Sequence, residues 1–379
     1  MSARFLTAVS GRAFNMRDRF GREIDYMRIS VIDSCNLNCY YCNPCDNNEY
    51  CHALNILSVK EVLCIVRAAT RLGIKHFRLT GGEPLLHPQL DEMVLQIKKI
   101  PGVSSVSLTT NAVLLVQHAK WLKEAGIDSI NVSLDTIDAS EYERITKKPL
   151  LEEVKHGINA AIECGIRVKI NVVLTPQTDV VALTRYVAKK GTDIRFIEMM
   201  PVGEGHTNGV EPYKKVIGTL SKLYGEPCRI NTEKTKEINS GNDKYKEERK
   251  NPDNGPAEYY SFHGLDIRVG LIQAIHGKFC DTCNRIRVTA DGRLMPCLGS
   301  SVTMDLVPDS CDFTDDVEKD FAIVQALRAA IKAKPGCHNF NDNAVTYTKT
   351  TETKTTEIKT TELKAAEVNA ARNMSRIGG

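Results

Sequence analysis

The chain has 379 residues, enough to bury a sizeable core, and its 42% hydrophobic and 26% charged content is typical of a globular protein. A formal net charge of +3 gives no reason to expect general binding to nucleic acid or to a membrane surface. No apolar run approaches the roughly 18 residues of a spanning helix, and the N-terminus lacks the apolar stretch of a signal peptide. We therefore expect a cytoplasmic protein.

Between residues 26 and 200, short apolar, β-branched segments alternate with amphipathic ones. This alternation predicts βαβ units and a parallel sheet, and six units suit either an incomplete barrel or a doubly wound sheet. The expected strands span residues 26–32, 76–80, 105–110, 129–134, 168–174 and 194–199. The expected helices lie near residues 59–72, 89–99, 114–125, 151–164 and 179–190. Three of these helices precede a glycine that suits a left-handed C-cap: Gly73, Gly126 and Gly165.

Chemically distinctive residues follow each expected strand. They are 35–42, Gly81-Gly82-Glu83-Pro84, Thr110-Asn111, 133–135, Asn171 and 198–200. Parallel α/β folds place their sites at the carboxyl ends of the strands, so we expect these segments to share one site. Any one of them taken alone could equally be a solvated loop.

Thirteen cysteines, an odd number, argue against a complete disulfide framework. One tight group has the spacing C-x3-C-x2-C and comprises Cys35, Cys39 and Cys42. This spacing lets one loop wrap an iron–sulfur cluster, and three ligands leave one iron open to a small molecule. Cys45 adds a candidate fourth ligand, so a structural zinc site and a closed electron-transfer cluster remain alternatives. Single cysteines are expected to be small buried hydrophobes: Cys64, Cys164, Cys228, Cys311 and Cys337.

The first cysteine triplet, with Tyr41 before its third member, resembles the cluster motif of the radical S-adenosylmethionine superfamily. The segment Gly81-Gly82-Glu83-Pro84 resembles the glycine-rich segment that contacts the methionine end of the cofactor. Glycines permit close backbone approach, and Glu83 can accept a hydrogen bond from an ammonium group. The resemblance implies a [4Fe–4S] cluster, and S-adenosylmethionine as the source of a 5′-deoxyadenosyl radical that takes a hydrogen atom from a substrate.

A second group has the spacing C-x2-C-x13-C and comprises Cys280, Cys283 and Cys297. A zinc ribbon would need further ligands, for which Cys311 is the nearest cysteine, so we interpret the group as a second cluster with an open iron. Arg285 and Arg287 follow at alternate positions, and a strand would project both to one face. Paired guanidinium groups suit phosphate, although two arginines alone are more often an exposed surface.

Residues 277–298 and the terminal RNMSRIGG narrow the resemblance to the GTP 3′,8-cyclases of molybdenum cofactor biosynthesis, as do segments 106–111, 129–135 and 194–203. The resemblance covers about residues 20–340 and the last eight residues of the chain. It implies an α/β fold: an incomplete (β/α)6 TIM-type barrel whose C-terminal extension carries a second [4Fe–4S] cluster. It further implies that GTP binds the open iron of this cluster through guanine and becomes 3′,8-cyclo-7,8-dihydro-GTP.

The resemblance also implies roles for individual residues. Contacts to S-adenosylmethionine are implied for Tyr41, Gly81, Gly82, Glu83, Ser133 and Met200. Contacts to GTP are implied for Arg28, Arg78, Thr109, Lys169, Arg195, Arg285, Ile286 and Arg287. Catalytic roles are implied for Arg285, Arg287 and the terminal Gly378 and Gly379. Independently, charged residues within strands favour a cavity for a polyanion, because buried charge is costly unless paired. The alternative is that they pair with Asp135 and Glu198.

We predict a partial barrel at 1–225, a second-cluster and substrate-binding region at 226–340, a low-complexity linker at 341–370 and a Gly-Gly tail at 371–379. Implied partners are an external one-electron reductant and a downstream cyclic pyranopterin monophosphate synthase, and a homodimer is left open. Ala112 stands where the family usually has glycine, so the turn after the third strand is expected to differ. Two rivals remain, a peptide-modifying radical maturase and a non-catalytic iron–sulfur electron carrier or redox sensor.

Overall fold

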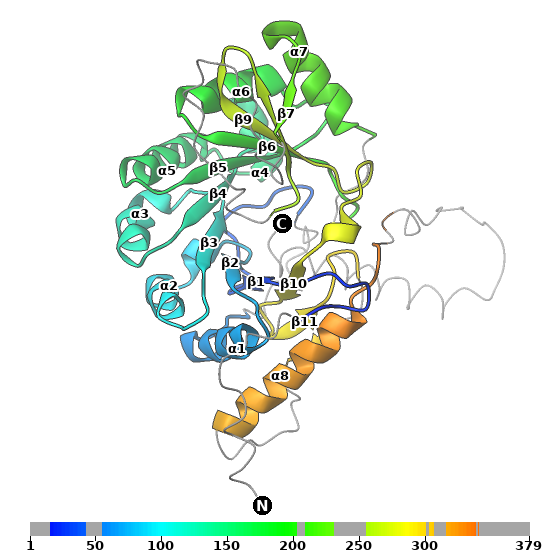
Figure 1. The fold of residues 1–379 in the computed structure, drawn as a ribbon. Helices are drawn as coiled ribbons and strands as arrows, with labels where there is room; N and C mark the ends of the chain where they lie inside the picture. The colour runs from blue at the N-terminus through cyan, green and yellow to red at the C-terminus, as the bar shows by residue number, and fades with distance from the viewer. Residues whose placement is uncertain are drawn as a thin grey trace, which may run out of the picture.

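The computed structural model describes residues 16–42, 55–202, 209–230, 255–300, 303–306, 316–338 and 340. The described strands are β1 (Tyr26–Ser30), β2 (His76–Thr80), β3 (Ser105–Thr110), β4 (Ser129–Ser133), β5 (Val168–Val173), β6 (Asp193–Ile197), β7 (Cys228–Ile230), β8 (Glu258–Phe262), β9 (Leu265–Ile272), β10 (Arg285–Val288), β11 (Arg293–Met295) and β12 (Met304–Asp305). They form one sheet in the order β12-β11-β10-β1-β2-β3-β4-β5-β6-β9-β8-β7, which does not close (Figure 1).

The parallel part of the sheet is wider than the sequence predicted. Strands β1 to β6 pair in parallel in chain order, which confirms the six expected strands; several end one or two residues earlier than expected. In addition, β10 pairs in parallel with β1, and β9 pairs in parallel with β6. The strand-rich segment near 259–297 therefore extends the same sheet at both of its sides.

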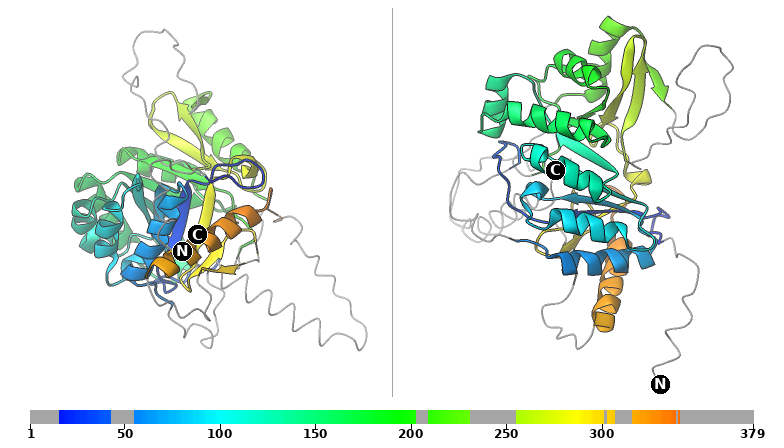
Figure 2. Two further views of the ribbon diagram at one scale, coloured as in Figure 1. Left: turned by 60° about the horizontal axis from the view of Figure 1, so that its bottom comes forward. Right: turned by 90° about the vertical axis from the view of Figure 1, so that its left-hand side faces the viewer.

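Helices lie along the outer side of this sheet (Figures 1 and 2). The described helices are α1 (Val59–Arg71), α2 (Leu90–Lys98), α3 (Leu115–Glu124), α4 (Ala139–Thr146), α5 (Leu151–Glu163), α6 (Val180–Lys189), α7 (Gly218–Tyr224) and α8 (Asp316–Ala333), with short turns η1 (Pro84–Leu86), η2 (Tyr213–Ile217) and η3 (Cys280–Thr282). The five predicted helices are confirmed, whereas α4, α7 and α8 were not predicted. None of the described helices has both the length and the apolar character required to cross a membrane.

Local sequence signals explain where helices begin and end. Ser58 and Glu61 form a capping box at α1, with the Glu61 N–H donating to the Ser58 hydroxyl at 3.3 Å and the Ser58 N–H donating to the Glu61 carboxylate at 2.8 Å. The predicted left-handed glycines are confirmed: φ is 86° at Gly73, 87° at Gly126 and 68° at Gly165.

The turn after β3 keeps the backbone that glycine would favour. Ala112 has φ 65°, in the left-handed region, and is fully buried. The expectation that this turn differs from that of the family stays a prediction, but the backbone here adopts the left-handed conformation in spite of the methyl group. We attribute this to packing, since the Ala112 carbonyl lies against α5, where a Cβ on Gly157 would approach it to 2.3 Å.

The two faces of the parallel strands differ in chemistry. On the helix-covered face, Met27, Phe77 and Leu79 are fully buried in the main apolar cluster. On the other face, polar side chains stand opposite one another in the register of the strands. Pairs of this kind are Arg28 with Arg78, Arg28 with Arg287, Thr109 with Asn131, and Asn171 with Arg195. Since alternate residues of a strand point to opposite faces, these pairs create a polar inner surface.

Candidate active site

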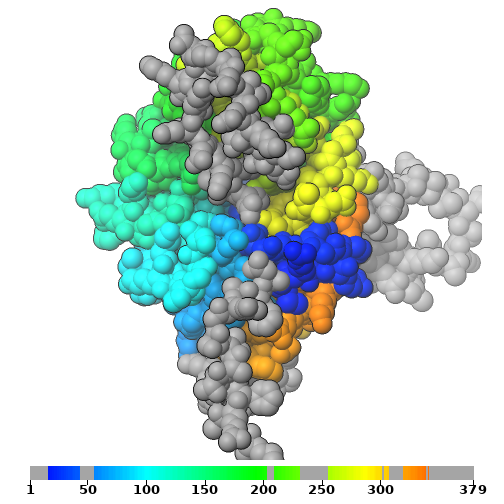
Figure 3. All heavy atoms as spheres, viewed as in Figure 1, coloured from blue at the N-terminus to red at the C-terminus, as the bar shows by residue number. Residues whose placement is uncertain are grey.

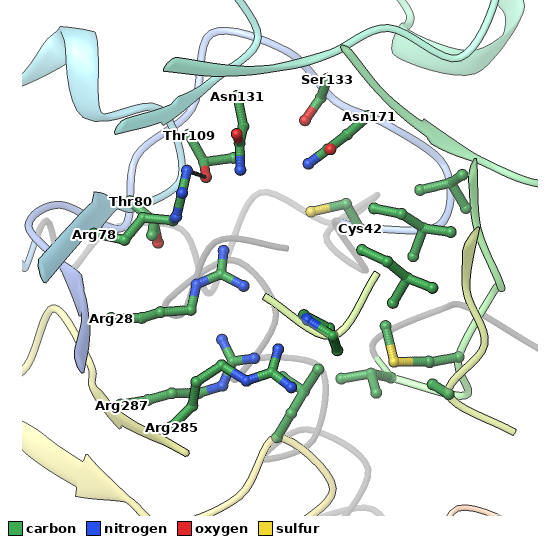
Figure 4. A pocket seen from close by; sticks show the side chains of 18 of the residues that line it. Arg28, Cys42, Arg78, Thr80, Thr109, Asn131, Ser133, Asn171, Arg285 and Arg287 are labelled. Atoms are coloured by element: carbon green, nitrogen blue, oxygen red, sulfur yellow. Dashed lines mark hydrogen bonds between the residues drawn. The ribbon is translucent and has the colours of Figure 1, made fainter. Parts of the chain in front are cut away.

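A cavity of about 300 Å³ lies on the polar face of the sheet (Figure 4). Both cysteine triplets, the glycine-rich segment and most of the predicted cationic residues line it. Of the predicted site residues, Lys169 and Ile286 are fully buried and do not line the cavity, and Gly378 and Gly379 lie outside the described residues. Ile286 lies in the apolar cluster because it alternates with Arg285 and Arg287, which both face the cavity as predicted.

In the first cysteine triplet, the sulfur of Cys35 has hydrogen-bond donors close to it. The backbone N–H of Leu37 donates to Cys35 Sγ at 3.5 Å, and the Asn111 side-chain amide donates to the same sulfur at 3.8 Å. Burial raises the pKa of the Cys35 thiol to about 12 and that of Cys42 to about 11, so bare thiolates are unfavourable there. A bound cationic centre would offset that cost, and nearby N–H donors are suited to cluster thiolates. The triplet therefore fits an iron–sulfur cluster, whereas Cys45 lies outside the described residues.

The glycine-rich segment packs directly against the backbone that leads into this triplet. A Cβ on Gly82 would lie 2.2 Å from the Ser34 carbonyl oxygen, and one on Gly81 would lie 2.4 Å from the Ile32 carbonyl oxygen. The Gly82 N–H donates to Ile32 and the Glu83 N–H donates to Ser34, both at 2.8 Å. Glycine is thus required at both positions for the protein's own backbone contact.

The carboxylate of Glu83 is already bonded within the protein. It accepts from the N–H groups of Leu85 at 3.0 Å and Asn111 at 2.7 Å and from the Thr110 hydroxyl at 2.7 Å. Burial raises the pKa of Glu83 to about 7, against the opposing effect of these hydrogen bonds. The side chain therefore ties the second strand's end to the turn after the third, and its predicted bond to an ammonium group would add to these contacts.

Asp135 and Glu198, the carboxylates that could have paired with the strand cations, have other hydrogen-bond partners. The Tyr41 hydroxyl donates to Asp135, which also accepts from the Val173 N–H at 2.7 Å. Glu198 accepts from the N–H groups of Ile275 at 2.7 Å and His276 at 3.1 Å, and its other oxygen contacts the His276 ring. Both carboxylates thus fix backbone segments around the cavity.

Arg78 and Arg195 are held by neutral oxygens. Arg78 donates to the Tyr26 hydroxyl, to the Leu108 carbonyl at 3.1 Å and to the Thr109 hydroxyl at 3.5 Å. Arg195 donates through Nε to the Asn171 side-chain oxygen at 3.0 Å. Because these partners carry no charge, the positive charge of both guanidinium groups remains available to a ligand.

The arginines gather at one side of the cavity, as Figure 4 shows for Arg28, Arg285 and Arg287. Burial, and next the charge of Arg287, hold the pKa of Arg28 well below its ordinary value. Burial and then Arg285 lower the pKa of Arg287 to about 10, which still leaves it charged at neutral pH. Within the described residues, Arg287 Nη1 and Arg195 Nη2 are buried without a hydrogen-bond partner. Buried donors of this kind indicate a site for a polyanionic ligand.

The second cysteine triplet lies beside these arginines. Burial opposes ionisation of Cys283, but Arg285 and Lys334 outweigh it and lower the pKa of this thiol to about 7. In the part of the chain that the structure describes, no three His, Cys, Asp or Glu side chains are close enough to hold a single metal ion. Burial raises the pKa of the Cys280 thiol to about 11, so Cys283 ionises more readily than Cys280. A [4Fe–4S] cluster is larger than one ion and takes its thiolates at separate corners, and three cysteines lining one cavity fit such a cluster.

The expectation for single cysteines is only partly correct. Cys64 is buried as predicted, but Cys228 and Cys337 are exposed, and Cys311 lies outside the described residues. The side chain of Cys337 lies within hydrogen-bonding reach of Cys280, so it joins the second triplet's surroundings. Sequence spacing gave no sign of this, because 56 residues, including α8, separate the two cysteines.

Several cavity residues were not predicted. They are Tyr26, Asn131, Phe279, Lys334, His338 and Phe340, and the Arg285 guanidinium lies 5.0 Å from the centroid of the Phe279 ring. The segment Lys-Pro-Gly-Cys-His that begins at Lys334 was the available signal, since a proline and a glycine end α8 and bring polar residues to one turn.

Comparison with known proteins agrees with this site. Residues 29–182 match the family model of the radical SAM superfamily, and residues 192–340 match that of Molybdenum Cofactor Synthesis C. A GTP 3′,8-cyclase of Clostridium perfringens is 36% identical over 330 residues, which are 86% of this chain and 95% of that protein. The chain belongs to the GTP 3′,8-cyclase family. A further GTP 3′,8-cyclase, from Petrotoga mobilis, is 34% identical over 338 residues, covering 86% of this chain and 96% of the relative.

Membership of the GTP 3′,8-cyclase family confirms the predicted resemblance and makes the chain a radical S-adenosylmethionine enzyme. The family implies a [4Fe–4S] cluster and S-adenosylmethionine. Among solved structures, Streptococcus suis SuiB bound to S-adenosylmethionine matches with a TM-score of 0.52 at 14% identity. That match covers 80% of this chain and 65% of SuiB, and it shows a shared fold.

Proposed function

We propose that this chain converts GTP into 3′,8-cyclo-7,8-dihydro-GTP, the first step of molybdenum cofactor biosynthesis. The observation that carries the proposal is the cluster of Arg28, Arg285 and Arg287, which lies across the cavity from Cys42 of the first triplet (Figure 4). A triphosphate needs several cationic donors, and guanidinium groups bind phosphate oxygens in pairs. An electron carrier or redox sensor would not need a buried cationic surface in front of its cluster.

The first triplet would hold the radical-forming cluster, and Tyr41, Gly82, Ser133 and Met200 line the cavity beside it. Bound at that cluster and reduced, S-adenosylmethionine supplies a 5′-deoxyadenosyl radical. The chain's own part is to orient and to exclude water. Tyr41 is fixed by Asp135, and the glycine-rich segment fixes the loop that leads to Cys35.

The opposite side of the cavity would bind GTP. Arg28, Arg285 and Arg287 would bind the triphosphate, and the buried donor of Arg195 would bind a further polar group of the nucleotide. Held in this way, the ribose would present its C3′ hydrogen, which would leave as part of 5′-deoxyadenosine, and the resulting C3′ radical would then form the C3′–C8 bond. One electron and one proton complete the dihydro product, with the electron coming from an external reductant. Positioning of this kind converts an encounter into an intramolecular step.

The finer architecture is part of the same proposal. We interpret the sheet as a partial TIM-type barrel whose C-terminal extension holds a second [4Fe–4S] cluster on Cys280, Cys283 and Cys297. The division near residue 225, the entry of Gly378 and Gly379 into the site, the downstream synthase and a homodimer stay predictions. The fit of Cys283 beside two cations supports the second cluster.

The test is anaerobic incubation of the reconstituted protein with dithionite, S-adenosylmethionine and GTP, followed by mass spectrometry. We expect 5′-deoxyadenosine together with a cyclised product that has the mass of GTP. Replacing GTP by ATP should abolish the cyclised product, and Cys42→Ala should abolish both compounds. Formation of 5′-deoxyadenosine without a cyclised nucleotide would instead indicate another substrate, such as a peptide, and absence of both would reject a radical enzyme.

A further inference from the structure

Two buried cations outside the arginine cluster contact the segments that carry the second cysteine triplet. They are Arg22, which precedes β1, and Lys334, which follows α8; their residues are 8% and 3% exposed. The space-filling view shows residues 16–42, in dark blue, against the 255–300 segment, in yellow, and α8, in orange (Figure 3). Neither residue was predicted as part of the site.

Arg22 is oriented by a buried ion pair and bonds to the backbone of Cys280. Its Nε lies 2.6 Å from the Asp18 carboxylate, whose other oxygen accepts from the Phe20 and Arg22 N–H groups at 2.9 and 3.0 Å. Its Nη1 donates to the Cys280 carbonyl at 2.6 Å and to the Gly336 carbonyl at 3.1 Å. Its Nη2 donates to the Pro335 carbonyl at 2.6 Å. One guanidinium thus joins the first cysteine of the triplet to the turn that carries Lys334.

Lys334 joins the segments that carry the other two cysteines. Its Nζ donates to the Arg285 carbonyl at 2.8 Å and to the Pro296 carbonyl at 2.9 Å. It also donates to the side chain of Cys283. Pro296 directly precedes Cys297, so a single ammonium group spans the chain on either side of the cluster site. These three partners use all three N–H bonds of an ammonium group.

No carboxylate among the described residues pairs with Lys334, although it is almost fully buried. A buried cation without a counter-charge is costly, and carbonyl dipoles repay only part of that cost. A cluster held by three thiolates would provide the missing negative charge at the position of Cys283. Hydrogen bonds and positive charge at a cluster's sulfur ligands also raise its reduction potential.

We propose that Arg22 and Lys334 are positioning residues for the second cluster, Arg22 through the backbone of Cys280 and Lys334 through Cys283 and the segment before Cys297. The inference rests on the proposed second cluster. Neither residue supplies a ligand to iron. Their function is to fix the three cysteines before the cluster binds and, for Lys334, to raise the potential of the bound cluster.

The test compares Lys334→Met, Lys334→Arg and the matched control Lys332→Met, an exposed lysine two residues earlier on α8. Iron and sulfide are measured after anaerobic reconstitution, and each cluster's potential is followed by EPR during a reductive titration. We expect Lys334→Met to lose iron from the second cluster and to lower the potential of what remains. Lys334→Arg should keep most of the iron with a smaller shift. Lys332→Met, and the first cluster in every variant, should match wild type.

The outcomes separate this inference from the proposed cluster. If wild type and Cys283→Ala hold the same amount of iron, the second cluster itself is wrong. If wild type holds two clusters and Lys334→Met keeps both at unchanged potentials, the positioning role is wrong. If Lys334→Met fails to fold, the variants Lys334→Arg and Arg22→Lys test the positioning role instead. Both keep the charge but change the hydrogen-bond geometry. Wild-type iron content and potential in both of these variants overturn the proposal.

Discussion

Gly82→Ala should destabilise the protein and empty the first cluster site. The new Cβ would lie 2.2 Å from the Ser34 carbonyl oxygen and 2.5 Å from that of Asp33, whereas ordinary contact begins near 3.4 Å. The neighbouring backbone must therefore move by about 1 Å, which breaks the 2.8 Å hydrogen bonds from Gly82 to Ile32 and from Glu83 to Ser34. Two lost hydrogen bonds and the overpacking together cost about 3–5 kcal/mol.

That loss is a large part of the roughly 5–15 kcal/mol that stabilises a typical domain. Urea denaturation of the apo-protein measures it, and iron analysis after anaerobic reconstitution reports the displacement of the Cys35 loop. Gly218→Ala is the matched control, because Gly218 has helical φ −61° and no atom within 4 Å of the added methyl. This control should be neutral or gain up to about 1 kcal/mol. A Gly82→Ala protein with wild-type stability and first-cluster iron would refute the reasoning.

Three further predictions follow from the site. Burial raises the pKa of Glu83 from 4.5 to about 7, so the folded state holds a proton that the unfolded state releases between these values. The unfolding free energy should therefore fall as pH rises from about 5 to 7. Denaturation of the apo-protein at several pH values should show that Glu83→Gln flattens this dependence of stability on pH. An unchanged dependence in the variant would contradict the prediction. Arg287→Met should weaken GTP binding at least about tenfold by calorimetry without destabilising the apo-protein, because it relieves repulsion of Arg28; tight binding by the variant would exclude this role. Cys42→Ala should lose the first cluster by iron analysis whereas Cys45→Ala should keep it, and the reverse pattern would make Cys45 a ligand.

Short-range sequence signals gave the core of the fold correctly. Glycines after helices, such as Gly73 and Gly126, and the period of apolar residues fixed five helices and six parallel strands, because each signal acts within a few residues of chain. Helix α4 was missed although the sequence carries its start signal, an N-cap at Asp138 with Glu141 three residues later. The placement of β9 and β10 could not be foreseen, because strand pairing over long separations depends on the whole sheet.

The residues of the site likewise include some that the sequence identified and others that it did not. The two triplets and the cationic strand residues were identified from spacing and from family resemblance, and the structure brings all of them except Lys169 to one cavity. Arg22 and Lys334 were not identified, because their importance comes from carbonyl groups of residues far away in the sequence. A backbone carbonyl exists at every position, so no motif distinguishes the residue that will bond to it.

The pairing of β10 with β1 has a consequence for how the protein is made. The first strand emerges from the ribosome early, yet its partner on one side is complete only at Val288, and Arg22 lies 258 residues from the carbonyl that it holds at Cys280. Contacts this distant in sequence form slowly, and until they form β1 presents an unpaired edge. During synthesis, the nascent chain therefore carries a half-built cavity and an edge that can pair with other chains. Iron delivered at that stage would meet the first triplet alone, so the first cluster should assemble before the proposed second one.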